Sequence, residues 1–205
     1  MSRAVFFDRD GVINTLVYRQ EKDFFDSPFS LEEFQLLPGA AEGIRLVNEL
    51  GMLAIVVSNQ PGIAKGNCSL EMMEQMNEKM RTELAALDAS LDAIYYCYHH
   101  PEGNIEMYRT VCQCRKPKPG LLLMAAHDFA IDLKLSYMIG DRLKDMQAGR
   151  KAGCKTIFLN NHPDPKEHLS SGFDYIDGSL LEAVRQIYQL EGKWISLSIP
   201  PTPLR

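Results

Sequence analysis

The stretch AVFFDRDG, residues 4–11, decides the fold. Its four apolar residues predict a short buried strand, and Asp8 and Asp10 follow where that strand ends. One residue separates the two acids, so they converge on one site only if the chain turns sharply at Gly11. Taken alone, the pattern is as typical of a polar turn that closes a strand as of a reaction centre.

Outward from this stretch, short apolar runs alternate with helical patterns. Strands are predicted at 52–57, 92–97, 136–141 and 156–160, and helices at 38–51, 69–88, 121–130, 143–152 and 180–191. Ser69 is the expected N-cap of its helix, and Gly51 the expected stop of the first. The alternation predicts an α/β fold, a Rossmann-like three-layer sandwich with a central parallel sheet. Ligands of such sheets bind beyond the carboxyl ends of the strands.

A chain of 205 residues is predicted to form one domain over residues 1–191, with a proline-interrupted tail at 192–205. Two stretches break the alternation, residues 15–37 and 97–119, and each begins soon after a predicted strand. We expect both to be loop insertions at the carboxyl edge of the sheet that contact the substrate.

Composition excludes several classes of partner. The net charge of −5 and the pI near 5.6, without a basic stripe, exclude a general nucleic-acid binder. Asp8 interrupts the only apolar run near the N-terminus, and no segment approaches transmembrane length. The expectation is a cytoplasmic protein, monomeric and without nucleic-acid or membrane partners.

A second strand end carries more acids. SYMIGDRLKD, residues 136–145, places Asp141 and Asp145 after an apolar run. Carboxylates gathered at neighbouring strand ends repel one another unless a cation joins them, and oxygen ligands of this kind suit Mg²⁺. Ser58 and Asn59 end a third strand, and Lys116 supplies a cation. Together these groups predict a site for phosphoryl transfer.

Four ordered motifs now resemble those of the haloacid dehalogenase (HAD) superfamily of phosphohydrolases: DRDG (8–11), Ser58 in VVSNQ, Lys116 in CRKP, and GDRLKD (140–145). The resemblance implies a HAD-like sheet with a minimal cap. It further implies that Asp8 attacks phosphorus and that Asp10 protonates the leaving oxygen and then activates water. Mg²⁺ would bind the carboxylates of Asp8 and Asp141 and the backbone carbonyl of Asp10. Ser58 and Lys116 would bind the phosphoryl oxygens.

The role of Asp145 stays open at this point. It is equally suited to bind the metal through water, to orient the turn, or to cap the following helix.

The cysteines predict a second metal site. Cys97, Cys112 and Cys114 bracket one loop, with His99 or His100 beside them, and three sulfurs with one imidazole suit structural tetrahedral Zn²⁺. Spacing alone does not choose between the two histidines, and the alternative is a set of buried thiols with a surface histidine. Zinc would stabilise the loop that leads into Arg115 and Lys116. Cys68 and Cys154 are expected to be ordinary thiols.

The proposed zinc loop narrows the resemblance from the HAD superfamily to one group within it. IYYCYHHPEG, CRKPKPG and GDRLKDMQAG are similar to the D-glycero-D-manno-heptose 1,7-bisphosphate phosphatase group, and the histidinol-phosphate phosphatase domain shares the loop. This resemblance favours His99 as the zinc ligand and implies that Asn59 and Arg115 contact the substrate. Two features depart from the heptose group. Arg142 replaces its lysine, and residues 15–37 form a longer segment without its glycine.

The predicted activity is therefore a Mg²⁺-dependent phosphatase for a small phosphorylated metabolite, a sugar phosphate, with heptose 1,7-bisphosphate 7-phosphatase leading. The alternatives are a histidinol-phosphate or other small-metabolite phosphatase, a polynucleotide end phosphatase, a phosphotransferase or mutase, and a zinc-loop binding module. His127, His162, His168 and the fragment NNHPDPKEH (160–168) are predicted to be solvated or structural. Met72, Met73, Met76 and Met80 are predicted to be a core face.

Overall fold

A computed structural model describes residues 1–169 and 171–192. Its main sheet has six strands in the order β5-β4-β1-β6-β7-β8, and every neighbouring pair is parallel. The strands are β1 (Ala4–Phe7), β4 (Leu53–Asn59), β5 (Ala93–Cys97), β6 (Tyr137–Gly140), β7 (Lys155–Leu159) and β8 (Tyr175–Asp177). The predicted parallel α/β sheet is confirmed.

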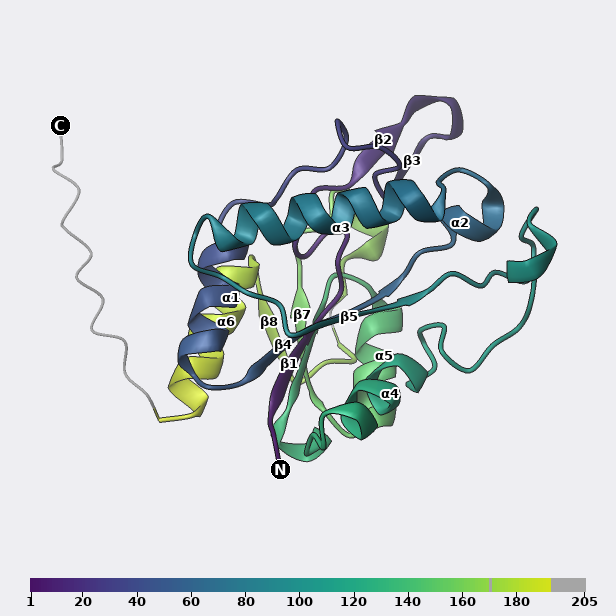
Figure 1. Ribbon diagram of the computed structural model, residues 1–205. Coiled ribbons are helices and arrows are strands. Elements are labelled where there is room, and N and C mark those ends of the chain that lie inside the picture. The colour runs from purple at the N-terminus through teal and green to yellow at the C-terminus, as the bar shows by residue number, and fades with distance from the viewer. Residues whose placement is uncertain (170, 193–205) are drawn as a thin grey trace, which may run out of the picture.

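Helices cover both faces of this sheet (Figure 1). They are α1 (Ala40–Glu49), α2 (Gly62–Lys65), α3 (Leu70–Ala85), α4 (Gly120–Asp128), α5 (Leu143–Ala152) and α6 (Leu180–Leu190). Side chains of α1, α3 and α6 share one apolar cluster, and those of α4 and α5 belong to another. The central strands are buried on both faces, which is why they are continuous apolar runs in the sequence.

Most predicted elements lie where the sequence placed them. Ser69 caps α3, and its hydroxyl accepts a hydrogen bond from the backbone N–H of Met72. Met73, Met76 and Met80 are buried in the core, as predicted, and Met72 packs against it. Strand β8 was not predicted, because its three residues do not form an apolar run: Tyr175 and Asp177 are partly buried and Ile176 is exposed.

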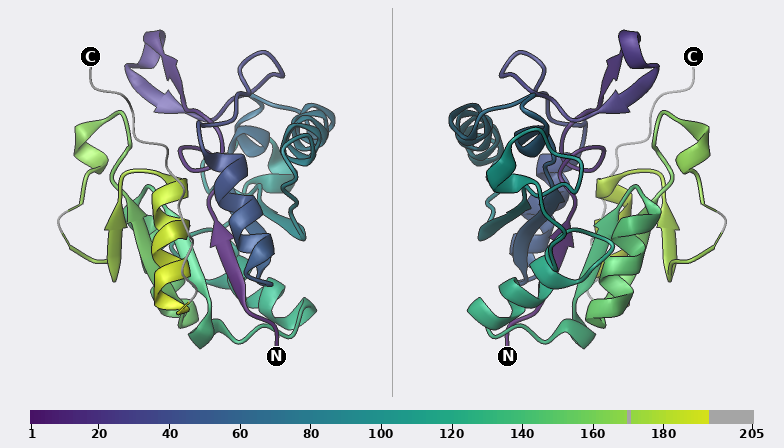
Figure 2. Two further views of the ribbon diagram at one scale, coloured as in Figure 1. Left: turned by 90° about the vertical axis from the view of Figure 1, so that its left-hand side faces the viewer. Right: turned by 90° about the vertical axis from the view of Figure 1, so that its right-hand side faces the viewer.

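The segment at residues 15–37 is more ordered than a loop. It contains a two-stranded antiparallel hairpin of β2 (Val17–Arg19) and β3 (Phe24–Asp26), with a 3₁₀ turn, η1 (Gln20–Lys22), between them. The hairpin rises above the carboxyl edge of the main sheet (Figure 2). The segment 15–37 thus forms a small cap.

The remaining short 3₁₀ turns are η2 (Glu106–Tyr108), η3 (Leu133–Leu135) and η4 (Pro165–Glu167). No helix within the described residues is both long and apolar enough to cross a membrane. The tail predicted at 192–205 lies, from residue 193 on, outside the described residues.

Candidate active site

The topology brings the predicted acids together. Strand β1 pairs with β4 on one side and with β6 on the other, so the residues that end these three strands meet at one edge. Asp8 follows β1, Ser58 lies near the end of β4, and Asp141 follows β6. Gly11 has φ +84°, and a Cβ there would lie 2.2 Å from Asp141 Oδ2. Only glycine therefore permits the close approach of the first turn to Asp141.

Lys116 is the cation at the centre of this edge. Its Nζ lies 3.0 Å from Asp8 Oδ2 and 2.7 Å from Asp145 Oδ1, and it donates to the carbonyl of Val57 at 2.8 Å. Burial raises the pKa of Asp8, but the charges of Lys116 and Lys144 and a hydrogen bond from Ser58 outweigh it and lower that pKa to about 2. Asp8 is thus an ionised carboxylate at neutral pH.

At Asp141 the charges of Arg142 and Lys144 do not outweigh burial. Its side chain is fully buried, and neither carboxylate oxygen has a hydrogen-bond partner in the described structure. Burial, followed by the charges of Asp145 and Asp8, raises the pKa of Asp141 well above its usual value. One oxygen from each of Asp8, Asp141 and Asp145 falls within 4.8 Å of the others. Orphaned buried oxygens and a hard donor set fit Mg²⁺.

Asp145 has two roles in the structure. Its Oδ2 accepts a hydrogen bond from the backbone N–H of Arg142 at 3.1 Å, and so it caps the N-terminus of α5. Its Oδ1 pairs with Lys116. Helix capping, one of the three roles left open by the sequence, is therefore observed, and the carboxylate also positions the lysine.

Asn59 holds the backbone of Lys116. Its Oδ1 accepts from the Lys116 N–H and its Nδ2 donates to the Lys116 carbonyl, both at 3.0 Å. This pair of bonds fastens the end of the 97–119 segment to the end of β4. The substrate contact predicted for Asn59 stays a prediction, although the residue does line the cleft described below.

Asp10 lies in a dense hydrogen-bond network. Its Oδ1 accepts from Arg9 Nε at 2.9 Å and from Asn14 Nδ2 at 3.0 Å, and its Oδ2 accepts from Gln60 Nε2 and Ser27 Oγ, both at 2.7 Å. Sequence reasoning assigned none of these four partners a role. Arg9 could have been noticed as a charge between two catalytic candidates, whereas Ser27 has no local signal.

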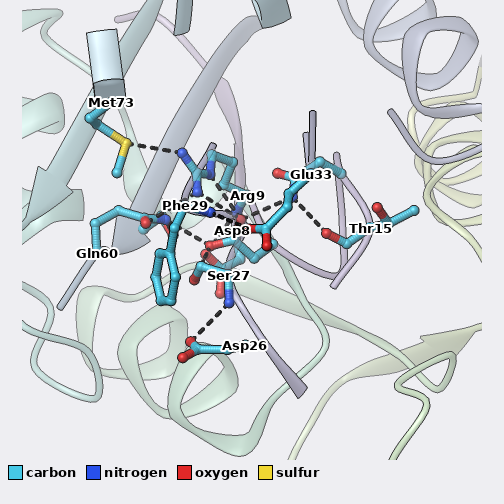
Figure 3. Close-up of polar contacts among 12 residues, drawn as sticks. Asp8, Arg9, Thr15, Asp26, Ser27, Phe29, Glu33, Gln60 and Met73 are labelled. Carbon is cyan, nitrogen blue, oxygen red and sulfur yellow. Dashed lines mark hydrogen bonds and ion pairs between the residues drawn. The ribbon is translucent and has the colours of Figure 1, made fainter. Parts of the chain in front are cut away.

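Arg9 is completely buried, which is unusual for its type. Besides Asp10, its guanidinium donates to Gln60 Oε1 and to the sulfur of Met73, both at 3.1 Å (Figure 3). The guanidinium carbon also lies 5.5 Å from the centre of the Tyr96 ring. The arginine thus ties the first turn to β4, α3 and β5.

Asp8, Asp10, Ser58 and Asn59 line a cleft of about 200 Å³. Phe24 and Phe25 of the hairpin form one wall, opposite the strand ends. Four further cationic side chains line it: Lys65, Arg115, Arg142 and Lys144. The same lining includes the carboxylates of Asp8, Asp10 and Asp26. In a chain with net charge −5, four cations gathered in one small cleft suit a ligand with more than one anionic group.

Arg142 is held by a loop that sequence reasoning dismissed. Its Nη2 lies 3.1 Å from His162 Nε2, and its Nη1 lies 3.9 Å from Glu167. His162 is only 4% exposed, and Phe25 packs edge-on against its ring. Of the two alternatives predicted for His162, the structural one therefore applies. The rest of the 160–168 turn is exposed or half-buried.

The structure also gathers the predicted zinc ligands. Cys114 Sγ lies 3.4 Å from Cys97 Sγ, 3.3 Å from Cys112 Sγ and 3.4 Å from His99 Nδ1, and Cys97 Sγ lies 3.5 Å from Cys112 Sγ. A tetrahedral zinc with bonds of about 2.3 Å separates its sulfur ligands by about 3.8 Å. The distances between the four atoms are thus slightly shorter than the edges of such a tetrahedron. The three cysteines are free thiols, with no disulfide among the described residues.

His100 does not join this cluster. Its Nδ1 accepts a hydrogen bond from the backbone N–H of Glu102 at 3.1 Å, which closes a turn. Arg115 Nη1 donates to the carbonyl of His99 at 3.3 Å, so the cluster also orients the next cationic residue. The choice of His99 over His100, which spacing could not make, follows from this geometry.

Comparison with known proteins agrees with the fold and the site. A family model for HAD-hydrolase-like proteins matches residues 113–176. The D-glycero-β-D-manno-heptose-1,7-bisphosphate 7-phosphatase of Escherichia coli (strain K12) is 38% identical over 188 residues, 90% of this chain and 93% of that protein. The same enzyme of Photorhabdus laumondii is 40% identical over 164 residues, 78% of this chain and 82% of that protein.

A solved structure has the same fold. The D,D-heptose 1,7-bisphosphate phosphatase from B. bronchiseptica, complexed with magnesium and phosphate, aligns with a TM-score of 0.76 and 28% sequence identity. The alignment covers 92% of this chain and 99% of that one.

Proposed function

This chain belongs to the HAD-like phosphatases, in the family of the D-glycero-β-D-manno-heptose-1,7-bisphosphate 7-phosphatases, and we propose that it hydrolyses the 7-phosphate of that sugar bisphosphate. One observation carries the proposal. The ionised carboxylate of Asp8 lies 3.0 Å from the ammonium of the buried Lys116, near Asp141, whose oxygens have no described hydrogen bond. Asp8 also lines a cleft together with four cationic side chains.

The residues divide the reaction between them. Asp8 attacks phosphorus and forms an aspartyl-phosphate while the ester P–O bond breaks, and Asp10 gives its proton to the leaving sugar oxygen. A water molecule then attacks the same phosphorus, Asp10 takes its proton, and the bond to Asp8 breaks to release phosphate. Ser58 and Lys116 bind the phosphoryl oxygens and offset their charge throughout. Ser58 is buried beside Asp8, where its hydroxyl can reach the phosphoryl group under attack.

We propose that Asp8, Asp141 and the backbone carbonyl of Asp10 hold Mg²⁺. When bound, this cation polarises the phosphoryl oxygens and reduces their repulsion of the Asp8 carboxylate. The four-residue cluster of Cys97, His99, Cys112 and Cys114 is proposed to hold structural Zn²⁺. It keeps Arg115 and Lys116 at the edge of the sheet.

A bisphosphate substrate accounts for the cationic side chains that line the cleft in addition to Lys116 at the reaction centre. One phosphate of a bisphosphate occupies the reaction centre, and the second needs its own positive partners. Lys65 and Arg115 line the same cleft and suit that second phosphate.

Residues 1–191 are proposed to act as one domain, in a cytoplasmic monomer that needs neither nucleic acid nor a membrane. A polynucleotide substrate is disfavoured because the chain carries a net charge of −5 and its sequence contains no basic stripe.

We expect Mg²⁺ to stabilise the protein more strongly as the pH rises. Burial and neighbouring acids raise the pKa of Asp141 above its ordinary 3.8. In the metal-free protein, the contribution of this group to stability is present at low pH. It is lost as the pH rises from the ordinary aspartate range through the raised pKa, since the buried site must then ionise. A bound cation compensates that charge.

Thermal melts with and without MgCl₂ over this range of pH measure the effect. The gain in melting temperature from Mg²⁺ should grow with pH in the wild type. Asp141→Asn is the matched control, in which the gain should be small and independent of pH. A gain in the wild type that stays constant over the range would contradict the assignment of Asp141.

The proposed substrate is tested by phosphate release from both anomers of heptose 1,7-bisphosphate, from a heptose 7-phosphate and from histidinol phosphate. We expect the bisphosphate to be preferred. Lys65→Met should raise its KM about 10-fold, the loss of roughly 1.4 kcal/mol of binding, and change the KM of the 7-phosphate little. Lys134→Met alters an exposed lysine outside the cleft and is the control. Equal KM changes for both sugars would argue against a second phosphate at Lys65.

A further inference from the structure

The serine that follows the hairpin reaches the reaction centre. Ser27 comes directly after β3, and its Oγ donates a 2.7 Å hydrogen bond to Asp10 Oδ2. It belongs to the segment 15–37, one of the two features that depart from the heptose phosphatase pattern. No other side chain from this hairpin is described in contact with Asp10.

The backbone around Ser27 is held firmly. Its N–H donates to Asp26 Oδ1 at 2.8 Å (Figure 3). Its carbonyl accepts from Arg19 Nη2 at 2.7 Å. Arg19 also forms a two-bond ion pair with Glu33 and lies 4.4 Å from the centre of the Phe29 ring. The hydroxyl is therefore presented to Asp10 by a braced turn, since both strands of the hairpin contribute to it.

The chemistry of this hydroxyl differs from that of the other partners of Asp10. Arg9, Asn14 and Gln60 present N–H groups to the carboxyl, and these groups donate but do not accept. The hydroxyl of Ser27 can do both, because its proton rotates about the C–O bond. It can donate to the ionised carboxylate and turn its own proton away when Asp10 carries the proton destined for the leaving oxygen. The bonds from Arg9 and Asn14 fall on Oδ1, and of the two described partners of Oδ2, Gln60 and Ser27, only Ser27 can turn its donor away in this manner.

We propose that Ser27 is a positioning residue that holds the Asp10 carboxyl in line for proton transfer as the carboxyl loses and regains its proton. The inference rests on the proposed phosphatase function. In the first half-reaction the proton leaves Asp10 for the sugar oxygen, and the hydroxyl turns to donate to the new carboxylate. In the second, Asp10 takes a proton from the attacking water, and the hydroxyl turns back.

The dependence on the leaving group tests this assignment. The 7-phosphate of the heptose leaves as an alkoxide and needs the proton, whereas p-nitrophenolate leaves without one. The parameter kcat/KM covers the steps up to departure of the leaving group, so the later water attack does not enter it. Ser27→Ala should lower kcat/KM for heptose 1,7-bisphosphate about 10- to 100-fold, and for p-nitrophenyl phosphate less than about 3-fold.

Two variants and one check complete the design. Ser27→Thr keeps a hydroxyl and should restore most of the activity toward the sugar ester. Ser30→Ala is the control, since it removes a hydroxyl of the same segment, one that bonds Glu32 instead of Asp10. Its activity toward both esters should match that of the wild type. Equal losses toward both esters with Ser27→Ala, or no loss toward either, would overturn the proposal. If the wild type releases no more phosphate than Asp8→Asn, the proposed phosphatase function itself has failed.

Discussion

Replacing Asp8 by Asn is expected to lower phosphate release at least ~10⁴-fold while the fold is kept. The amide oxygen of asparagine is a poor nucleophile and cannot form the acyl-phosphate bond on which the proposed reaction depends. Stability should fall but the fold should be kept, because the lowered pKa of Asp8 shows that its ionised form is favoured in the folded protein, while Lys116 retains its ion pair with Asp145. Loss of activity would then be separate from loss of structure.

Steady-state phosphate release and a thermal melt measure the two parts of this prediction. Acid-quenched wild-type protein, digested and weighed, should carry one added phosphoryl group on the peptide that contains Asp8, and the variant should not. Asp88→Asn is the matched control, since Asp88 is exposed at φ 56° and asparagine tolerates that conformation. Activity of the Asp8→Asn protein near the wild-type level would exclude Asp8 as the nucleophile.

Removal of the proposed zinc is expected to have the second largest effect, on stability and activity together. The four ligands hold both ends of the segment from Cys97 to Cys114 within 3.8 Å of one another, and Lys116 follows two residues later. Without the metal, the crowded thiols gain nothing from their proximity, and the segment regains its loop entropy. Lys116 would lose the support that keeps it beside Asp8.

We expect chelation of the wild type, or the substitution Cys114→Ser, to cost about 3–5 kcal/mol of stability, less than the ~10–16 kcal/mol of zinc-finger peptides. For a chain of this size that corresponds to a melting temperature lower by about 10 °C. Phosphate release should fall ~100-fold or more. Added Zn²⁺ should restore the chelated wild type but not the variant.

Elemental analysis should find one zinc per wild-type chain and less in Cys114→Ser. Cys68→Ala is the control, because Cys68 is a buried thiol just before α3 and lies outside the cluster. This substitution should leave zinc content and melting temperature close to the wild type. A wild-type protein purified without zinc, whose melting temperature chelators do not change, would contradict the structural role.

The main sheet and the family were predictable from the sequence because their signals are local. Each central strand is a continuous apolar run, and an ordered motif follows at the carboxyl end of β1, β4 and β6. Parallel strands put these ends at one edge, so Asp8, Ser58 and Asp141 could be expected to meet. Both expectations about fold and family are confirmed.

Other features depended on contacts between distant parts of the chain. His99 and His100 are equivalent by spacing, and the folded loop separates them, since it turns one ring toward three sulfurs and the other toward Glu102. Likewise, no local pattern connects Ser27 with Asp10, 17 residues away. Only the hairpin, which bends the segment 15–37 back over the strand ends, brings the two together.

By itself, then, the sequence determined the parallel sheet, the order of its motifs and the chemical character of both proposed metal sites. These follow from burial patterns and residue types, which are properties of short stretches. The tertiary structure decided which partners each functional group has: Asn59 and Asp145 for Lys116, Ser27 for Asp10 and His162 for Arg142. Such contacts depend on how loops from separate parts of the chain pack over one edge, and a local pattern does not encode that packing.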